Sequence, residues 1–369
     1  VDDDGDVEIL LAKSYESYRA KDIQVVDGKT GAVKETVETP SMTSNTSHAI
    51  YKVDGVTHLL IPVAPDYSII ADRSYLYAYK YDKIQKKFVF AWKSDRTFID
   101  DSAPSFPAVA DLDGDGTPEV IVGQTIFNGR TGIALAQFPT GVSTTTIANS
   151  IGIGDVLSNG TQQLVFAGRV YSVQFANKNA FNTTAFTLEA TAPATSLSLD
   201  RHVALADFNN DGHLDVLFVG VKALNVTTST TIVYAIWDVR NNRFLGSSAF
   251  ESPIITASGG FAIKTSIPMI GDVNGDGLLE FIFMTYNKLF CYTYNPSTDA
   301  IETYWTYSVQ DQSGATGITL FDFNQDNNVE LVYRDEEKLW ILDGSEKNNC
   351  KMVREFDGIY SGTGNEYSI

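Results

Sequence analysis

The sequence predicts an all-β protein built from repeated units, and three observations lead to this prediction. A nine-residue acidic loop, Asp-x-Asp/Asn-x-Asp-Gly-x-x-Glu/Asp, recurs along the chain and each time precedes an apolar run. The repeats fill the whole chain at a similar spacing, as repeat folds require. No stretch longer than ten residues has a convincing helical period. The four loops that keep the acidic positions are Asp111–Glu119, Asp207–Asp215, Asp272–Glu280 and Asp322–Glu330, the last with Asn327 in place of the glycine.

Weaker copies of the loop complete the count of units. Residues 155–163 keep the frame with less charge, residues 53–58 keep only the turn, and the chain opens inside another copy that ends at Glu8. The last loop positions fall at residues 8, 58, 119, 163, 215, 280 and 330, which gives seven units spaced 44 to 65 residues apart. The first ligand of the opening loop would precede Val1, so we expect the native protein to extend further.

Each unit is predicted to contain four antiparallel strands. A short apolar run ending in a small residue comes first, as at 106–110 or 267–271, and the acidic loop follows it. A continuous apolar strand such as 216–219 is next, and this pattern is typical of a strand covered on both faces. Two more strands follow, joined by a tight turn such as 128–132. Seven such sheets in a closed ring form a seven-bladed β-propeller, here one domain over residues 1–369. The small residues fit the crowded position near its axis.

The two chain ends are expected to close the ring together. The distance from residue 330 through both ends to residue 8 is one more period, 47 residues. The unit that starts at Val1 has no first strand, and the C-terminal residues occupy the place of that strand in the period. We therefore predict that Glu366–Ile369 pairs beside Glu8–Ala12 as the innermost strand of that blade.

Composition and charge exclude some classes of protein. The formal charge of −19 argues against a nucleic-acid partner, since phosphate binding needs clustered Lys and Arg. No 18-residue apolar stretch is present, so no membrane span is expected. We expect a monomer. Cys291 and Cys350 are expected to be free thiols, with a disulfide as the alternative.

The acidic loops predict bound calcium. Side-chain oxygens at positions 1, 3 and 5 can converge on one point, position 7 adds its backbone carbonyl, and the acid at position 9 completes a shell that suits Ca²⁺. Asp, Asn and Gly also form turns without metal, but four aligned loops are harder to explain in this way. An EF-hand needs an acid near position 12, where these loops have apolar residues. About four ions and a partial fifth are expected; the ligands would be Asp111, Asp113, Asp115, Thr117 and Glu119; Asp207, Asn209, Asp211, His213 and Asp215; Asp272, Asn274, Asp276, Leu278 and Glu280; Asp322, Asn324, Asp326, Asn328 and Glu330; and, for the fifth, Asp2, Asp4 and Glu8.

The loop, its place between the first and second strands and the sevenfold count resemble the FG-GAP (VCBS-type) repeats of the integrin α-subunit propeller and its bacterial relatives. The resemblance covers essentially the whole chain, and loops 155–163 and 53–58 depart from it at ligand positions. The Phe-Gly and Gly-Ala-Pro motifs of the family are mostly blurred. The resemblance implies that the Ca²⁺ loops lie on one face and brace adjacent strands. It also implies that ligands are bound on the opposite face.

The favoured function is a non-catalytic, secreted protein, extracellular or at the cell surface, that recognises a protein or glycan and mediates adhesion. The four histidines are scattered, and no nucleophile or phosphate-binding motif occurs. The alternatives are a calcium-dependent polysaccharide lyase or glycosidase, because some such lyases resemble this repeat, and a structural spacer of a surface protein. Binding surfaces are expected in the loops between second and third strands, residues 13–21, 65–74 and 221–231, and in the segments between units, residues 95–107 and 251–264. Their candidate ligand-binding residues are Tyr15, Tyr18, Arg19, Phe98 and Phe261.

Overall fold

The protein is described by a computed structural model with no helix in its described residues. These residues are 5–16, 19–43, 48–63, 74–98, 107–139, 151–195, 202–221, 229–253, 265–285, 287–310, 317–326, 328–335 and 338–357. No helix long and apolar enough to span a membrane is found among them. By compactness the chain divides into residues 1–149 with 173–187, and residues 150–172 with 188–369.

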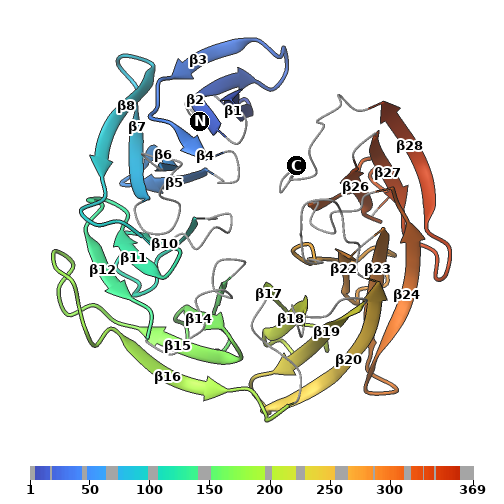
Figure 1. The fold of residues 1–369 in the computed structure, drawn as a ribbon. Coiled ribbons are helices and arrows are strands. Elements are labelled where there is room, and N and C mark those ends of the chain that lie inside the picture. The colour runs from blue at the N-terminus through green and yellow to red at the C-terminus, as the bar shows by residue number, and fades with distance from the viewer. Residues whose placement is uncertain are drawn as a thin grey trace. The chain divides into compact units, whose positions relative to one another are not determined.

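The first unit contains three antiparallel sheets (Figure 1). The strands of the first sheet are β1 (Glu8–Glu16), β2 (Arg19–Asp27), β3 (Val33–Val37) and β4 (Met42–Thr43). Those of the second are β5 (Ala49–Val53), β6 (Val56–Val63), β7 (Tyr75–Asp82) and β8 (Lys87–Lys93). Those of the third are β9 (Ala108–Ala110), β10 (Glu119–Val122), β11 (Thr125–Asn128) and β12 (Ala134–Gln137).

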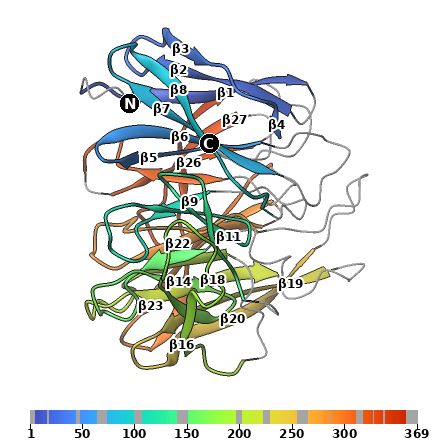
Figure 2. The same ribbon diagram turned by 90° about the vertical axis from the view of Figure 1, so that its left-hand side faces the viewer.

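The other four sheets are also antiparallel, and each follows chain order (Figure 1 and Figure 2). The fourth sheet has β13 (Gly152–Gly154), β14 (Gln163–Phe166), β15 (Arg169–Val173) and β16 (Phe186–Thr191), and the turn between the last two belongs to the first unit. The fifth has β17 (His202–Ala206), β18 (Asp215–Val221), β19 (Ser229–Asp238) and β20 (Arg243–Pro253). The sixth has β21 (Met269–Gly271), β22 (Glu280–Thr285), β23 (Lys288–Asn295) and β24 (Ala300–Ser308). The seventh has β25 (Ile318–Phe321), β26 (Glu330–Arg334), β27 (Lys338–Asp343) and β28 (Lys351–Asp357).

The predicted fold class is confirmed: the protein is an all-β, seven-bladed propeller of mostly four-stranded antiparallel blades. The first blade is the exception, because β4 pairs with β2 just beyond the end of β3. That blade therefore has three strand positions, and β1 lies where the second strand of the other blades lies, as the sequence predicted. The expected closing strand Glu366–Ile369 lies outside the described residues.

Small residues at the ends of the first strands allow close contact between neighbouring blades in the second unit. A Cβ atom on Gly154 would lie 2.8 Å from a methyl carbon of Leu205, in the first strand of the next blade. A Cβ atom on Gly271 would lie 2.8 Å from a methyl carbon of Leu320 in the same way. Both distances are shorter than carbon atoms tolerate, so these two positions accept only glycine without a shift of the neighbour.

The prediction of a loop at residues 13–21 is wrong. Residues 13–21 were expected to form a loop, but β1 and β2 extend through most of this segment as a hairpin. The segment is polar, so its strand character depends on pairing between the two strands and not on an apolar pattern.

Cys291 and Cys350 are free thiols, the first buried and the second half-buried.

Candidate functional site

The acidic loops share one internal frame, by which we mean a set of backbone N–H groups that donate to the carboxylate at position 1. Asp272 accepts the backbone N–H groups of Gly275 at 2.8 Å, Asp276 at 3.2 Å and Gly277 at 2.9 Å. Asp111 and Asp207 accept N–H groups from the equivalent positions. The first aspartate therefore shapes the loop through hydrogen bonds within the protein.

The degenerate loop 155–163 keeps the same frame. Asp155 accepts the N–H groups of Asn159 at 2.9 Å and Gly160 at 2.8 Å. This loop has lost the other acids of the pattern, so its fold does not require them. The frame alone is therefore no proof of a metal site, and the remaining oxygens have to be considered.

Two loop positions adopt the left-handed backbone conformation. The glycine at position 6 has a φ of 84° in Gly116, 85° in Gly212 and 83° in Gly277, as the sequence predicted. Position 4 also has positive φ, a constraint that sequence reasoning missed. The residues there are Gly114, Ser158, Asn210, Gly275 and Gln325. Glycine or asparagine at three of these five positions was the available signal.

The acid at position 9 is buried at the start of the second strand. Its carboxylate accepts the backbone N–H of position 2, at 2.9 Å from Leu112 to Glu119 and at 3.0 Å from Val273 to Glu280. The same bonds reach Asp215 and Glu330. Burial raises the pKa of Glu119, Asp215 and Glu280 to about 7. These buried carboxyls gain from a nearby cation, which favours their ionised form.

The loop Asp111–Glu119 gathers the most carboxylates. Asp111, Asp113 and Asp115 each offer an oxygen, and the three oxygens lie within 4.8 Å of one another. This triad can therefore hold a metal ion. Carboxylate oxygens in this number are the ligands of hard cations such as Ca²⁺.

A lysine from a distant turn points into this loop. The Nζ atom of Lys178 lies 2.6 Å from Asp113, 3.1 Å from Asp115 and 2.9 Å from Glu119. Burial alone would lower the pKa of Lys178, but the hydrogen bonds to the three carboxylates outweigh it, and the pKa is raised. Nothing in the local sequence of the loop indicated this partner.

The three other loops present carboxamides and backbone groups beside their acids. Asn274 Oδ1 accepts the N–H of Asp276 at 2.8 Å, and Asn324 Nδ2 donates to Glu330 at 2.8 Å. At position 7, the N–H groups of Thr117, His213, Leu278 and Asn328 donate to the acid at position 5. The His213 ring contacts Ser158 at 2.5 Å and Arg240, so it takes part in surface contacts.

The partial first loop also has a lysine partner. Lys34 Nζ lies 2.9 Å from the buried carboxylate of Glu8, and Lys29 pairs with Asp6. Asp2 and Asp4 lie outside the described residues. The predicted fifth metal site therefore stays a prediction.

The five candidate ligand-binding residues do not form one described patch. Tyr15 lies on β1 and Arg19 on β2, whereas Tyr18 and Phe261 lie outside the described residues. The Phe98 ring is 1% exposed and packs in a core cluster with Trp92 and Phe127. Phe98 therefore contributes to packing in this structure.

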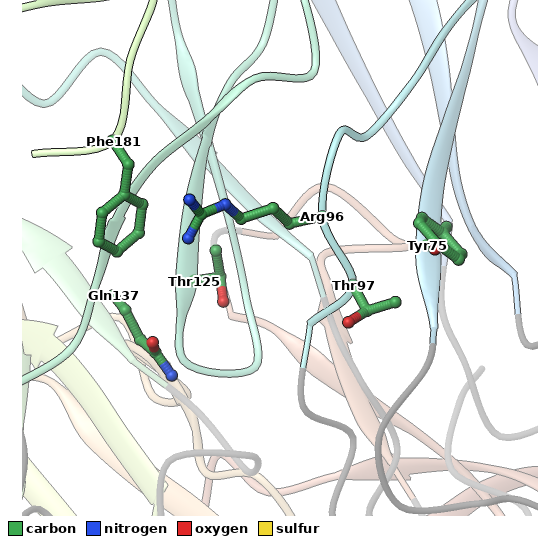
Figure 3. A pocket seen from close by; sticks show the side chains of 6 residues that line it. All are labelled: Tyr75, Arg96, Thr97, Thr125, Gln137 and Phe181. Atoms are coloured by element: carbon green, nitrogen blue, oxygen red, sulfur yellow. The ribbon is translucent and has the colours of Figure 1, made fainter.

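A polar pocket in the first unit was not predicted from the sequence. Its volume is about 280 Å³, and its walls come from Tyr75, Arg96, Thr97, Thr125, Gln137 and Phe181. Figure 3 shows the Arg96 side chain extending toward Phe181, with Thr125 beside it. The guanidinium carbon lies 4.4 Å from the centre of the Phe181 ring. Among the described residues, no carboxylate lies within ion-pair distance of Arg96.

The pocket lies at the end of the third blade that faces away from its acidic loop. Strand β10 starts at Glu119, beside the loop, and ends at Val122, and β11 returns from Thr125. Thr125 pairs with Gln137 in the sheet, so both pocket residues are at the far end. Acidic loop and pocket therefore occupy opposite ends of the same blade.

Comparisons with known proteins agree with this architecture. Residues 272–333, which include the loop Asp272–Glu280, match the model of the FG-GAP-like repeat. A search of curated proteins gave no match. Among solved structures, the V. cholerae biofilm matrix protein Bap1 is similar with a TM-score of 0.57 and 11% identity, over 99% of this chain and 79% of that chain.

Two further structures share the fold. The periplasmic gluconolactonase PpgL of Pseudomonas aeruginosa has a TM-score of 0.50 and 13% identity, over 95% of this chain and 96% of that one. Sqt1 of Saccharomyces cerevisiae has a TM-score of 0.50 and 10% identity, over 95% and 81%. Proteins with such different names share one scaffold, so the likeness concerns the fold. The chain is a seven-bladed β-propeller that carries an FG-GAP-like repeat.

Proposed function

We propose that the protein is a non-catalytic extracellular β-propeller that binds Ca²⁺ through its acidic loops and recognises a protein or glycan. One observation carries the proposal: acidic loop and polar pocket lie at opposite ends of the third blade. This division suits a scaffold whose acidic loops gather cations at one end of a blade and whose recognition surface lies at the other. The fold is one that a biofilm matrix protein uses, which agrees with a role outside the cell.

Calcium would bind where side-chain oxygens meet the buried acid at position 9. The candidate loops are Asp207–Asp215, Asp272–Glu280 and Asp322–Glu330, together with Asp111–Glu119. The buried acids favour a cation, because their ionised forms are costly without one. In Asp111–Glu119, calcium would first have to displace Lys178 from Asp113, Asp115 and Glu119.

Ligand recognition would involve the pocket around Arg96. Its guanidinium offers several N–H donors, and Thr97, Thr125 and Gln137 offer hydroxyl and amide groups. Such groups can hydrogen-bond to sugar hydroxyls or to polar groups of a peptide. The Phe181 ring supports Arg96 from one side and thereby limits its orientations.

A binding screen on glycan and protein arrays, with and without a calcium chelator, tests the proposal. We expect binding by the native protein and its loss in Arg96→Ala. Arg354→Ala is a matched control, because Arg354 also lies over a phenylalanine ring, at 4.9 Å from Phe356, but outside the pocket. Equal binding by both variants would exclude the pocket. Absence of any ligand would favour the structural spacer.

Calorimetry of the chelated protein tests the calcium part separately. We expect Ca²⁺ uptake with affinities suited to the roughly millimolar calcium outside cells. No heat of binding and no shift in melting temperature on calcium addition would rule this part out.

A further inference from the structure

The Lys178 ammonium already lies among the oxygens of one acidic loop. Its Nζ atom contacts Asp113, Asp115 and Glu119 at 2.6, 3.1 and 2.9 Å. The Lys178 side chain is 23% exposed and the Glu119 side chain is fully buried. Ca²⁺ needs oxygen ligands at about 2.3–2.6 Å, so ammonium and metal cannot use these three carboxylates together.

The turn that carries Lys178 is unusual in length. Twelve residues, 174–185, connect β15 with β16, whereas the other six turns between third and fourth strand positions have seven residues or fewer. The extra length allows the chain to reach the acidic loop of the third blade. A plain tight turn would not supply such reach.

Asn182 fixes this long turn in place. Its backbone N–H donates to the carbonyl of Leu135 in β12 at 2.7 Å. Its side chain donates to the carbonyls of Asn177 and Ala180, each at 2.8 Å, and accepts the N–H of Asn177 at 3.1 Å. Lys178 therefore extends from an ordered turn that is tied to the third blade.

Two other loops have no such lysine. Among the described residues, no Lys or Arg lies within ion-pair distance of a carboxylate in Asp207–Asp215 or Asp272–Glu280. Their buried acids, Asp215 and Glu280, accept only hydrogen bonds from neutral groups. The loop Asp111–Glu119 thus differs from these two in its own positive charge.

We propose that the Lys178 ammonium is the resident cation of the loop Asp111–Glu119. The lysine balances the charge of this loop without calcium, whereas the carboxylates of Asp207–Asp215 and Asp272–Glu280 have only the metal as a counter-charge. The role of Lys178 does not rest on the proposed function, whereas the statements about calcium do. Removal of the lysine charge turns Asp111–Glu119 into an additional calcium site, since its four carboxylates then lack a counter-charge.

The test compares Lys178→Met and Lys178→Arg with the native protein, first in chelator and then with Ca²⁺. In chelator, Lys178→Met should lower the melting temperature by about 5 °C or more, because a buried carboxylate loses its partner. Lys178→Arg should lower it much less. Lys347→Met, at an exposed pair with Glu302, is the control and should change little.

With Ca²⁺, native mass spectrometry should show one more ion on Lys178→Met than on the native protein. Calcium should also restore much of the lost melting temperature of this variant. Equal melting temperatures of Lys178→Met and the native protein in the presence of chelator would overturn the role of Lys178 as the resident cation. An unchanged ion count in Lys178→Met, together with loss of one ion in Asp276→Ala, would overturn the additional calcium site in Asp111–Glu119 and leave the proposed function intact. Absence of calcium from every variant would refute calcium binding, while a melting loss in chelator would still support the lysine as resident cation.

Discussion

Trp305 donates its indole N–H to the backbone carbonyl of Gly344 at 2.8 Å, from the fourth strand of one blade to the turn of the next. Trp92 makes the same bond to Gly129 at 3.1 Å. The glycine is required at Gly344 because a Cβ atom there would lie 2.7 Å from the Trp305 ring. A repeated tryptophan–glycine contact therefore links consecutive blades within each unit.

Trp305→Phe should destabilise the protein more than Trp92→Phe. Trp305 is 1% exposed, and its loss leaves a cavity and a buried carbonyl without this donor. The free energy of unfolding should fall by about 2–4 kcal/mol. At Gly129 the hydroxyl of Tyr51 also donates to the carbonyl, at 2.6 Å, so Trp92→Phe should cost less. Urea denaturation measures both changes, and a larger loss in Trp92→Phe would contradict this account.

Asp276→Ala should reduce the calcium-dependent rise in melting temperature. Asp276 offers a carboxylate at position 5 of a loop in which no lysine is found among the described residues. At a free calcium concentration of about 100 times the dissociation constant, one site adds about 2.7 kcal/mol to the free energy of unfolding, and the variant should lose that gain. Thermal unfolding over a calcium series measures it.

Asn159→Ala is the matched control in the degenerate loop. Asn159 accepts hydrogen bonds from Thr161 and Gln163, so the variant should melt somewhat lower at every calcium concentration. Its calcium dependence should nevertheless equal that of the native protein. Equal losses of calcium dependence in both variants would contradict the distinction between the two loops.

The metal-free protein should become less stable as pH rises from about 4.5 to about 7. Burial raises the pKa of Asp215 and Glu280 to about 7, above their values in the unfolded chain. The folded protein therefore binds more protons in this range, and the protonated forms stabilise it below pH 7. That stabilisation is lost as pH rises through the folded pKa.

Glu280→Gln should weaken this pH dependence. Glutamine keeps the acceptor for the Val273 N–H but does not ionise, and the chain itself has Gln163 at this position in the degenerate loop. Denaturation midpoints in chelator between pH 4.5 and 8 measure the slope. An exposed change, Glu355→Gln, serves as control. A steeper slope in Glu280→Gln would refute the assignment.

Local patterns explain why much of the fold could be predicted. The acidic positions of each loop and the apolar run that follows them are adjacent in sequence. Together they define the loops and the second strands. The positive φ at position 4 of the loop is also a local feature, but Ser158 and Gln325 at this position gave no signal of it, since they are not residue types that favour positive φ. The strands in residues 13–21 depend on their pairing, which polar residues do not reveal.

Long-range contacts were beyond the sequence. Lys178 reaches Glu119 across 59 residues, and only the unusual length of its turn hints at a special role. The pocket around Arg96 requires Phe181 from a segment 85 residues away. Phe98 shows the same limit, because an aromatic ring in a long connection can serve binding or packing, and only its burial distinguishes the two.

Gly271→Val should destabilise the second unit by overpacking. The added Cβ would lie 2.8 Å from the Leu320 methyl carbon and 3.5 Å from Val329. Such overpacking typically costs about 1–3 kcal/mol. The double variant Gly271→Val with Leu320→Ala should recover part of the loss, since it removes the clashing methyl group. Urea denaturation of the three variants gives the coupling, and additive losses would mean that the two residues do not meet.

Deletion of the last six residues should strongly destabilise or aggregate the protein. Among the described strands, β1 pairs only with β2, so its other edge is left for the predicted strand Glu366–Ile369. Ile9 and Leu11 on β1 are each 48% exposed, which is high for large apolar side chains in a strand. A closing strand would cover that edge, and without it the unpaired N–H and C=O groups of β1 can pair with another molecule. Thermal unfolding with light scattering measures both effects. If the truncated protein melts like the full chain and stays monomeric, the ring closes in another way.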